Sequence, residues 1–119
     1  LSEIEADSPS RKKGIFVSND THASILVNLL VRKYGKLPED YLIVGFDDSP
    51  ASRNAIFPIS TVAQQIDMLA TEAVKLLVEQ IEEHKNSKHT PVSEPVHKMI
   101  TPVLIRRETT ERDLLAEDN

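Results

Sequence analysis

Two stretches decide the fold, GIFVSND at residues 14–20 and YLIVGFDD at residues 41–48. Each is a short, continuous apolar run with β-branched residues, which is typical of a strand buried on both faces of a parallel sheet. Between them, apolar residues recur at helical spacing over residues 22–34. Residues 14–48 therefore predict a strand–helix–strand unit, and we expect its crossover to be right-handed.

The rest of the chain continues the alternation of strands and helices, so we assign it to the α/β class with a parallel sheet and flanking helices. The expected elements are a third strand at 59–63, an amphipathic helix at 66–83, two short strand pieces within 96–106, and a short helix or irregular segment at 51–56. Pro102 separates the two strand pieces because proline cannot donate to a ladder. Residues 84–95 predict a polar loop, and the polar residues 108–119 are expected to fray.

Composition narrows the class of protein. The chain has 119 residues, with 14 Lys and Arg against 19 Asp and Glu, and a formal net charge of −5. The length suits one domain, and the net acidity argues against a grip on DNA, because phosphate contacts need clustered Lys and Arg. There is no cysteine and no apolar run of the roughly 18 residues that a membrane span needs. The chain begins with Leu1, which we interpret as the mark of a fragment or a processed product.

Polar pairs follow both strands of the unit at equivalent places, Asn19-Asp20 after the first and Asp47-Asp48 after the second. In an open α/β sheet, ligands bind outside the carboxyl ends of the strands, so we expect these side chains to line one cleft. An amide donates and accepts while a carboxylate accepts, which suits a polyhydroxy ligand such as a sugar. The alternative is structural: one pair caps the helix and the other forms a turn.

A further alternative is that Asp47 and Asp48 hold Mg²⁺, as acidic pairs do in phosphotransfer domains. Such a site needs a third acidic ligand, and the sequence offers no clear one. The four histidines lack the spacing of a zinc site, and the three glycines are too far apart for a phosphate-binding loop. The sequence therefore predicts no catalytic residue, no cofactor and no metal, and we expect a protein that is not an enzyme.

The motifs, taken in order, resemble those of one family. The series consists of GIFVSND at 14–20, a helix, LPEDYLIVGFDDSP at 37–50, ISTVAQQ at 59–65, the amphipathic helix and LIRRETT at 104–110. It resembles the C-terminal half of the effector-binding domain in LacI/GalR-family transcriptional repressors, over residues 14–110. The resemblance implies a periplasmic-binding-protein-like fold, in which two α/β subdomains clamp a small ligand between them.

The resemblance also implies roles for individual residues. Asn19 matches a position that hydrogen-bonds effector hydroxyls, and Asp47 matches the effector-binding carboxylate. Gln64 matches a residue near the pocket, where the chain crosses between the subdomains. Asp20 and Asp48 are expected to serve the cap and the turn.

The helix at 22–34 is apolar on more than one face. The apolar residues that do not pack on the sheet face either a partner or a second element of the same domain. The resemblance implies a homodimer with an interface at Val27, Leu30, Ala51 and Ile56. It also implies that the long helix packs on an N-terminal subdomain, which this chain lacks. We divide the chain into a lead-in at 1–13, the effector-binding part at 14–110 and a flexible tail at 111–119.

The implied function is effector-dependent regulation of operator binding in the cytoplasm, with a small sugar-like effector and no membrane contact. DNA would be contacted only through a domain missing from this chain. The type of that domain stays open between a lac-type headpiece and the winged helix of the arabinose repressors. Two other functions stay open as well: a periplasmic sugar-binding protein that serves a transporter, and a small Mg²⁺-dependent phosphotransfer domain using Asp47 and Asp48.

Overall fold

The structure of the chain, a computed structural model, describes residues 11–86 and 95–117. The elements in chain order are β1 (Lys13–Phe16), α2 (Asp20–Tyr34), β2 (Tyr41–Phe46), α3 (Pro50–Asn54), β3 (Ser60–Ala63), α4 (Ile66–Asn86), β4 (Val103–Ile105) and α5 (Glu108–Glu117). Most of the expected lead-in, most of the expected loop and the last tail residues lie outside the described residues. The chain divides into two compact units, residues 1–63 with 103–119, and residues 64–102.

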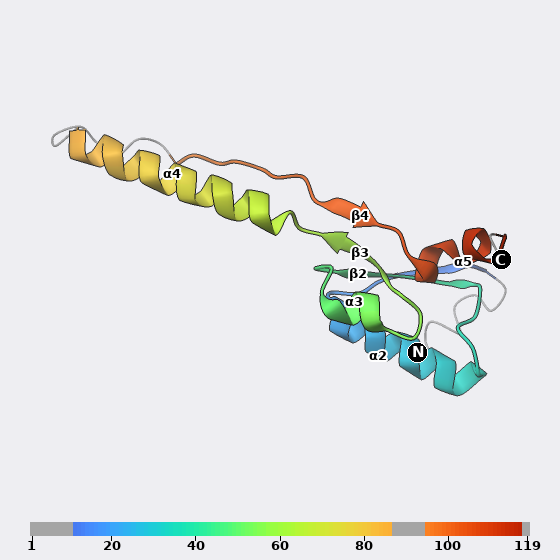
Figure 1. The fold of residues 1–119 in the computed structure, drawn as a ribbon. Coiled ribbons are helices and arrows are strands. Elements are labelled where there is room, and N and C mark those ends of the chain that lie inside the picture. Colours follow the sequence, from blue (N-terminus) through green and yellow to red (C-terminus); the bar gives the residue numbers. More distant parts are fainter. Residues whose placement is uncertain (1–10, 87–94, 118–119) are drawn as a thin grey trace. The chain divides into compact units, whose positions relative to one another are not determined.

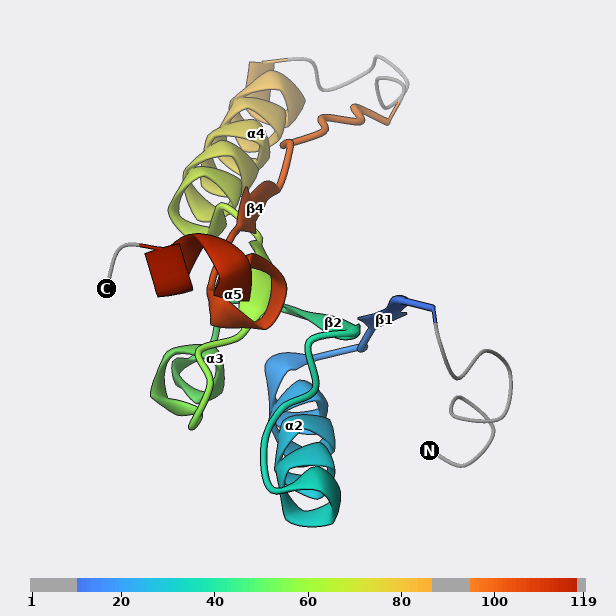
Figure 2. The same cartoon turned by 90° about the vertical axis from the view of Figure 1, so that its right-hand side faces the viewer.

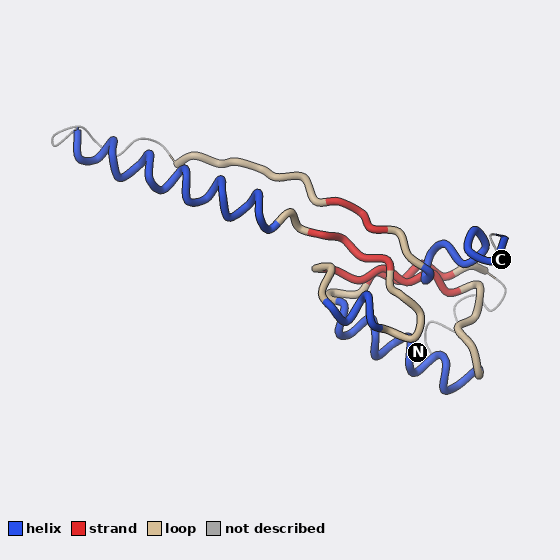
Figure 3. The backbone as a smooth tube through the Cα atoms, in the orientation of Figure 1, coloured by secondary structure: helices blue, strands red, loops and turns tan. Residues whose placement is uncertain are grey.

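The first unit is built on a four-stranded sheet in the order β1-β2-β3-β4. The first three strands run parallel, and β4 pairs antiparallel with β3. Figure 3 marks the strands in red along the backbone. The expected strand–helix–strand unit is therefore present as β1–α2–β2. In Figure 1, α2 and α3 lie together on one side of the strands and α5 lies on the other, and Figure 2 shows the same helices after a quarter turn.

The core of the first unit lies between α2 and the sheet. Helix α2 contributes a buried stripe at helical spacing, and β2 contributes alternate residues of its own. The buried hydrophobic residues are Ala23, Val27, Leu30, Leu37, Tyr41, Ile43 and Ile59. The helix ends at Gly35, whose φ of 75° is the left-handed conformation that closes many helices and favours glycine.

Two segments differ from the expectation. Within residues 95–106, only Val103–Ile105 forms a strand, since β3 has four residues and offers this stretch only Thr61, Val62 and Ala63 as partners. Residues 108–117 form α5, although their polarity predicted fraying. Thr109 anchors the first turn, because it is fully buried and hydrogen-bonded to strands far away in the sequence, and the helix is kinked at Glu111 beyond it.

The second unit consists of α4 and the extended segment that follows it. None of the residues of α4 is buried in this chain, although the helix has the apolar stripe that its sequence predicted. Its large exposed apolar residues are Ile66, Met68, Leu69, Val74, Leu77, Val78 and Ile81. The extended segment runs back beside the helix, held by Gln65, which donates to the Thr101 carbonyl, and by an ion pair between Lys98 and Glu72 (Figure 1).

Candidate functional site

The ends of β1 and β2 lie at one edge of the sheet. The two strands pair in parallel with Phe16 opposite Val44, so Asn19 and Asp47 both follow the carboxyl ends of neighbouring strands. This is the edge at which open α/β sheets bind ligands. The predicted placement of Asn19 and Asp47 beyond the strand ends is therefore confirmed, while their contact with an effector stays a prediction.

Asn19 caps the first turn of α2. Its backbone is extended, with φ −156° and ψ 168°, and its Oδ1 atom accepts a hydrogen bond from the amide of His22 at 2.8 Å. The cap satisfies one of the amide groups that the start of a helix leaves without an internal partner. Because this cap uses the side-chain oxygen, the two Nδ2 hydrogens are not needed for it.

The segment from Asp47 to Ser49 turns sharply after β2. Asp47 has φ 103° and Asp48 has φ 53°, a region that residues with a Cβ rarely adopt. Three successive amides of the turn donate to three different acceptors: Asp47 to the Val62 carbonyl at 2.9 Å, Asp48 to Thr61 Oγ1 at 3.3 Å, and Ser49 to an Asp20 carboxylate oxygen at 2.7 Å. The side chain of Asp47 remains exposed at the edge of the sheet.

Asp20 places a carboxylate in the interior beneath this turn. The residue is only 1% exposed, and it accepts from Thr61 Oγ1 at 2.6 Å and from the amide and hydroxyl of Ser49 at 2.7 and 3.2 Å. Gly45 makes room for it, because a Cβ atom on Gly45 would overlap Oδ1 of Asp20. The expected structural role of Asp20 is thus more specific than a helix cap: Asp20 joins α2, β3 and the turn.

Arg107 holds the other side of the turn. Its guanidinium donates to Asp48 Oδ1 at 2.7 Å, to Ser52 Oγ at 2.9 Å and to the Ile59 carbonyl at 3.1 Å. Arg53 reaches the same Asp48 oxygen at 3.3 Å from a more exposed position. Sequence reasoning missed this role for Arg107. The signal available was its place in the closing motif LIRRETT, two residues after Ile105.

Thr109 fastens the C-terminal segment to the sheet. Its hydroxyl donates to the Ile43 carbonyl at 2.7 Å and accepts from the Ser60 amide at 2.9 Å. The residue bridges Ile43 within β2 and Ser60 at the start of β3. Sequence reasoning missed this role too, since the residue was assigned to a polar segment expected to fray.

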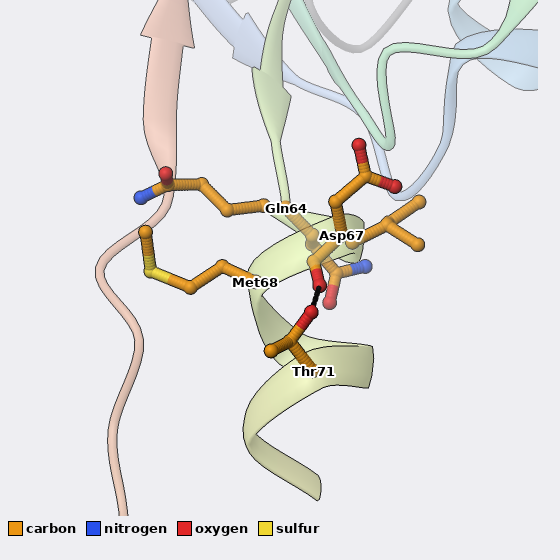
Figure 4. A pocket seen from close by; sticks show the side chains of 6 residues that line it. Gln64, Asp67, Met68 and Thr71 are labelled. Atoms are coloured by element: carbon orange, nitrogen blue, oxygen red, sulfur yellow. Dashed lines mark hydrogen bonds between the residues drawn. The ribbon is translucent and has the colours of Figure 1, made fainter. Parts of the chain in front are cut away.

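Gln64 belongs to the second unit. It lines an open pocket of about 690 Å³ together with Gln65, Ile66, Asp67, Met68 and Thr71. Figure 4 shows these side chains around the first turns of α4, where the Thr71 hydroxyl donates to the Asp67 carbonyl at 2.8 Å. The grouping of Gln64 with Asn19 and Asp47 in one effector site stays a prediction.

In the ion pair of the second unit, the carboxyl group of Glu72 has a lowered pKa. The hydrogen bond from Lys98 is the largest cause that holds the pKa of Glu72 below its ordinary value. Desolvation opposes it, and the charges of Lys98 and Lys75 lower the pKa further.

The residues predicted for a dimer interface have different environments. Val27 and Leu30 are fully buried in the core, so their side chains offer no surface to a second copy. For these two residues, the covering surface is the core of the same domain. Ile56 is 71% exposed and Ala51 is half-buried. The exposed large apolar residues on α2 are Ile25, Leu29 and Tyr34.

Among the described helices, none combines the length and the apolar character needed to cross a membrane. Across residues 11–86 and 95–117, no three His, Asp or Glu side chains group in a way that could hold a metal ion.

Known proteins match this chain in sequence and in fold. Residues 1–110 match the model of the periplasmic binding protein-like domain. The ribose operon repressor of Bacillus subtilis (strain 168) is 32% identical over 100 residues, which are 84% of this chain and 29% of that repressor. The HTH-type transcriptional repressor PurR of Haemophilus influenzae (strain PittGG) is 35% identical over 97 residues, 82% of this chain and 28% of the relative.

Among solved structures, the transcriptional regulator CelR in complex with cellobiose has a TM-score of 0.70 at 26% identity, covering 91% of this chain and 31% of CelR. The chain therefore spans less than a third of the length of the repressors it matches.

The parallel sheet, with polar residues gathered beyond its strand ends, defines an α/β domain of the periplasmic-binding-protein-like class. The chain belongs to the periplasmic binding protein-like domain family, in the form that serves as the effector-binding domain of LacI/GalR repressors. The predicted family and fold class are both confirmed.

Proposed function

We propose that the chain is the effector-sensing and dimerising part of a bacterial transcriptional regulator that responds to a sugar-like small molecule. The observation that carries the proposal is the exposed Asp47 carboxylate, held in a left-handed turn at the same sheet edge as the Asn19 cap. The names of two relatives support the ligand class, since one is a ribose operon repressor and another is a regulator solved with cellobiose.

The chemistry of the two residues suits a polyhydroxy ligand. Asp47 accepts hydrogen bonds from sugar hydroxyls, each contributing about 1.5–3 kcal/mol because the acceptor is charged. Asn19 donates through Nδ2 while its oxygen caps α2, and Gln64 contributes from the crossing after β3. The effector shifts the regulator between two states only by the difference in its affinity for them.

The partners follow from the same family. We place a homodimer contact on the outer face of α2 and α3, with Ala51 and Ile56 as predicted, and with Ile25 and Leu29 in place of the buried Val27 and Leu30. DNA is bound through a separate domain, the protein works in the cytoplasm, and it is not an enzyme. The relatives that match are named as repressors, which favours this function over a transporter's binding protein or a phosphotransfer domain.

The exposed apolar stripe of α4 belongs to the same proposal. A helix with this much exposed apolar surface gains stability by covering it, at roughly 25 cal/mol per Å² of apolar area removed from water. In a regulator of the relatives' length, the covering surface is the N-terminal subdomain of the effector-binding domain.

The test is thermal unfolding of the complete polypeptide encoded by the gene, with D-ribose, cellobiose, sucrose or Mg²⁺ added. We expect a sugar to raise the Tm, because binding adds RT ln(1 + [L]/Kd) to the free energy of unfolding, about 2.7 kcal/mol at 100 times Kd. Asp47→Ala should remove the shift and leave operator binding intact. Glu39→Ala is the matched control, because it removes an exposed carboxylate from the opposite end of β2.

Three results would contradict the proposal. One is a normal sugar response in Asp47→Ala, which would remove Asp47 from the site. Another is a Tm shift with Mg²⁺ alone that Asp47→Asn abolishes, which would favour the phosphotransfer function. The third is the absence of operator binding by the complete polypeptide.

A further inference from the structure

The conformation of the turn that carries Asp47 is imposed from outside the turn. Two successive residues with side chains, Asp47 and Asp48, have positive φ values of 103° and 53°. Aspartate adopts positive φ more often than most residues with a Cβ, but usually as a single residue and at φ of roughly 50–70°, whereas here two follow each other and Asp47 lies well beyond that range. Some other group must therefore hold the turn in this shape, and the amide acceptors show which groups do so.

Two of the three acceptors are side chains from other elements. The Thr61 hydroxyl, on β3, accepts from the Asp48 amide and donates to Asp20 Oδ1, while the other oxygen of Asp20 accepts from the Ser49 amide. The Thr61 hydroxyl and the Asp20 carboxylate thus form a continuous chain of hydrogen bonds under the turn. Both residues are buried, at 0% and 1% exposure, so water does not replace either of them.

We propose that Thr61 and Asp20 are positioning residues for effector binding: they hold the Asp47–Ser49 turn in the left-handed conformation that presents the Asp47 carboxylate at the sheet edge. The inference rests on the proposed role of Asp47 in binding a sugar-like effector. Neither positioning residue touches the ligand. Their effect passes through the backbone amides of residues 48 and 49.

Gly45 supports the same inference independently. A side chain at this position would overlap Asp20 Oδ1 and lie 3.3 Å from the Asp20 Cα atom. Gly45 therefore has no Cβ at the point where the Asp20 carboxylate lies against β2 and reaches Thr61. This close approach places Asp20 where it reaches the turn.

The structure supplies a matched pair of threonines for the test. Thr61 and Thr109 are both fully buried, and each hydroxyl donates one hydrogen bond and accepts one from a backbone amide. Only Thr61 contacts the turn. Valine has the shape of threonine without the hydroxyl. Both Thr61→Val and Thr109→Val therefore lose stability by removing a buried hydroxyl, but only Thr61→Val changes a contact with the turn.

The experiment uses the complete polypeptide and two measurements. The first is the affinity for D-ribose, cellobiose and sucrose by calorimetry, and the second is amide hydrogen exchange at Asp48 and Ser49. We expect Thr61→Val to lower the affinity for the bound sugar about tenfold, which corresponds to the free energy of one hydrogen bond. Hydrogen exchange at both amides should become faster. Thr61→Ser should restore both, and Thr109→Val should leave both unchanged.

The results separate the two proposals. If Asp47→Ala binds sugar normally, the proposed function fails, and exchange at the two amides still tests whether Thr61 holds the turn. If Asp47→Ala loses binding while Thr61→Val and Thr109→Val behave alike in affinity, the positioning role is overturned. Unchanged exchange at Asp48 and Ser49 in Thr61→Val overturns it as well, whichever sugar binds.

Discussion

Arg107 and Asp48 lie 59 residues apart in the sequence, and their side chains form an ion pair at 2.7 Å. The pair is largely enclosed, with side-chain exposures of 17% for Arg107 and 24% for Asp48. Arg107 follows β4 almost directly, so the last strand of the sheet leads into a contact with the turn after β2. The segment after β4 is therefore linked to the turn that carries Asp47 in the candidate effector site.

Replacing Arg107 by glutamine should destabilise the protein clearly. The change removes a charged donor from a partly buried carboxylate, and we expect a loss of about 1.5–3 kcal/mol in the free energy of unfolding. Arg53→Gln is the control, because Arg53 approaches the same oxygen at 3.3 Å with half of its side chain exposed. The free energy of unfolding of Arg53→Gln should fall by no more than about 1 kcal/mol, as for other surface ion pairs. Urea unfolding of the two variants measures both values.

A double-mutant cycle with Asp48→Asn tests whether the Arg107 effect belongs to this pair. If Arg107→Gln costs the same whether residue 48 is Asp or Asn, then the contacts to Ser52 and Ile59 carry the stability instead.

Gly45→Ala should cost about 1–3 kcal/mol, as expected for an added methyl group with no room in a packed interior. The new Cβ would displace the Asp20 carboxylate from its place beside β2. Gly14→Ala is the control in the neighbouring strand, since nothing lies within 4 Å of a Cβ there. That change should be neutral or stabilise the strand by up to about 1 kcal/mol. Equal thermal stability of the two variants would contradict the close approach of Asp20.

Asn19 is expected to combine a structural and a binding role, and two substitutions separate them. Asn19→Asp keeps an oxygen acceptor for the His22 amide and adds a negative charge at the start of α2, so the stability should be retained. The same change removes the amide donor, so the affinity for a sugar should fall. Asn19→Ala should lose both affinity and about 1 kcal/mol of stability. Full sugar affinity in Asn19→Asp would show that the amide donor is not used.

The pair of Glu72 and Lys98 predicts a pH dependence at low pH. Because the hydrogen bond from Lys98 lowers the pKa of Glu72 in the folded state, the pair stabilises the protein above the ordinary pKa of a glutamate. This contribution disappears as the pH falls through the lowered pKa. NMR titration of the Glu72 side chain should show its pKa rising toward the ordinary value in Lys98→Gln. The rise should be smaller in Lys75→Gln, and an equal rise in both variants would contradict the hydrogen bond as the main cause.

Local pattern was sufficient for β2 and the first helix. It was not sufficient for β1, which was predicted as a buried strand but lies at the edge of the sheet with Phe16 66% exposed. The predicted strand at 41–46 has the observed bounds, because a strand buried by a helix shows its apolar run directly in the sequence. The start of α2 at Asp20 and its end at Gly35 follow from residues whose capping chemistry is local. The positions of Asn19 and Asp47 at one sheet edge follow in turn from the parallel arrangement.

The remaining features depend on contacts between distant residues. The burial of Thr109 needs Ile43 and Ser60, which lie 66 and 49 residues away, so polarity alone predicted the wrong state for its segment. The amphipathic pattern of α2 likewise did not distinguish the side chains that face the sheet, Val27 and Leu30, from those that face outward, Ile25 and Leu29. The chain of hydrogen bonds from Asp20 through Thr61 to the turn joins three elements, and no spacing in the sequence marks it.

The first unit is assembled from two separated parts of the chain, residues 1–63 and 103–119. During synthesis at about 5–20 residues per second, the three parallel strands leave the ribosome seconds before the second part exists. Until Thr109 emerges, the carbonyl of Ile43 and the amide of Ser60 lack the hydroxyl that joins them in the folded chain. Newly made molecules therefore pass through a stage in which β3 is an open edge without β4, and an unpaired strand edge is a template for pairing with another chain.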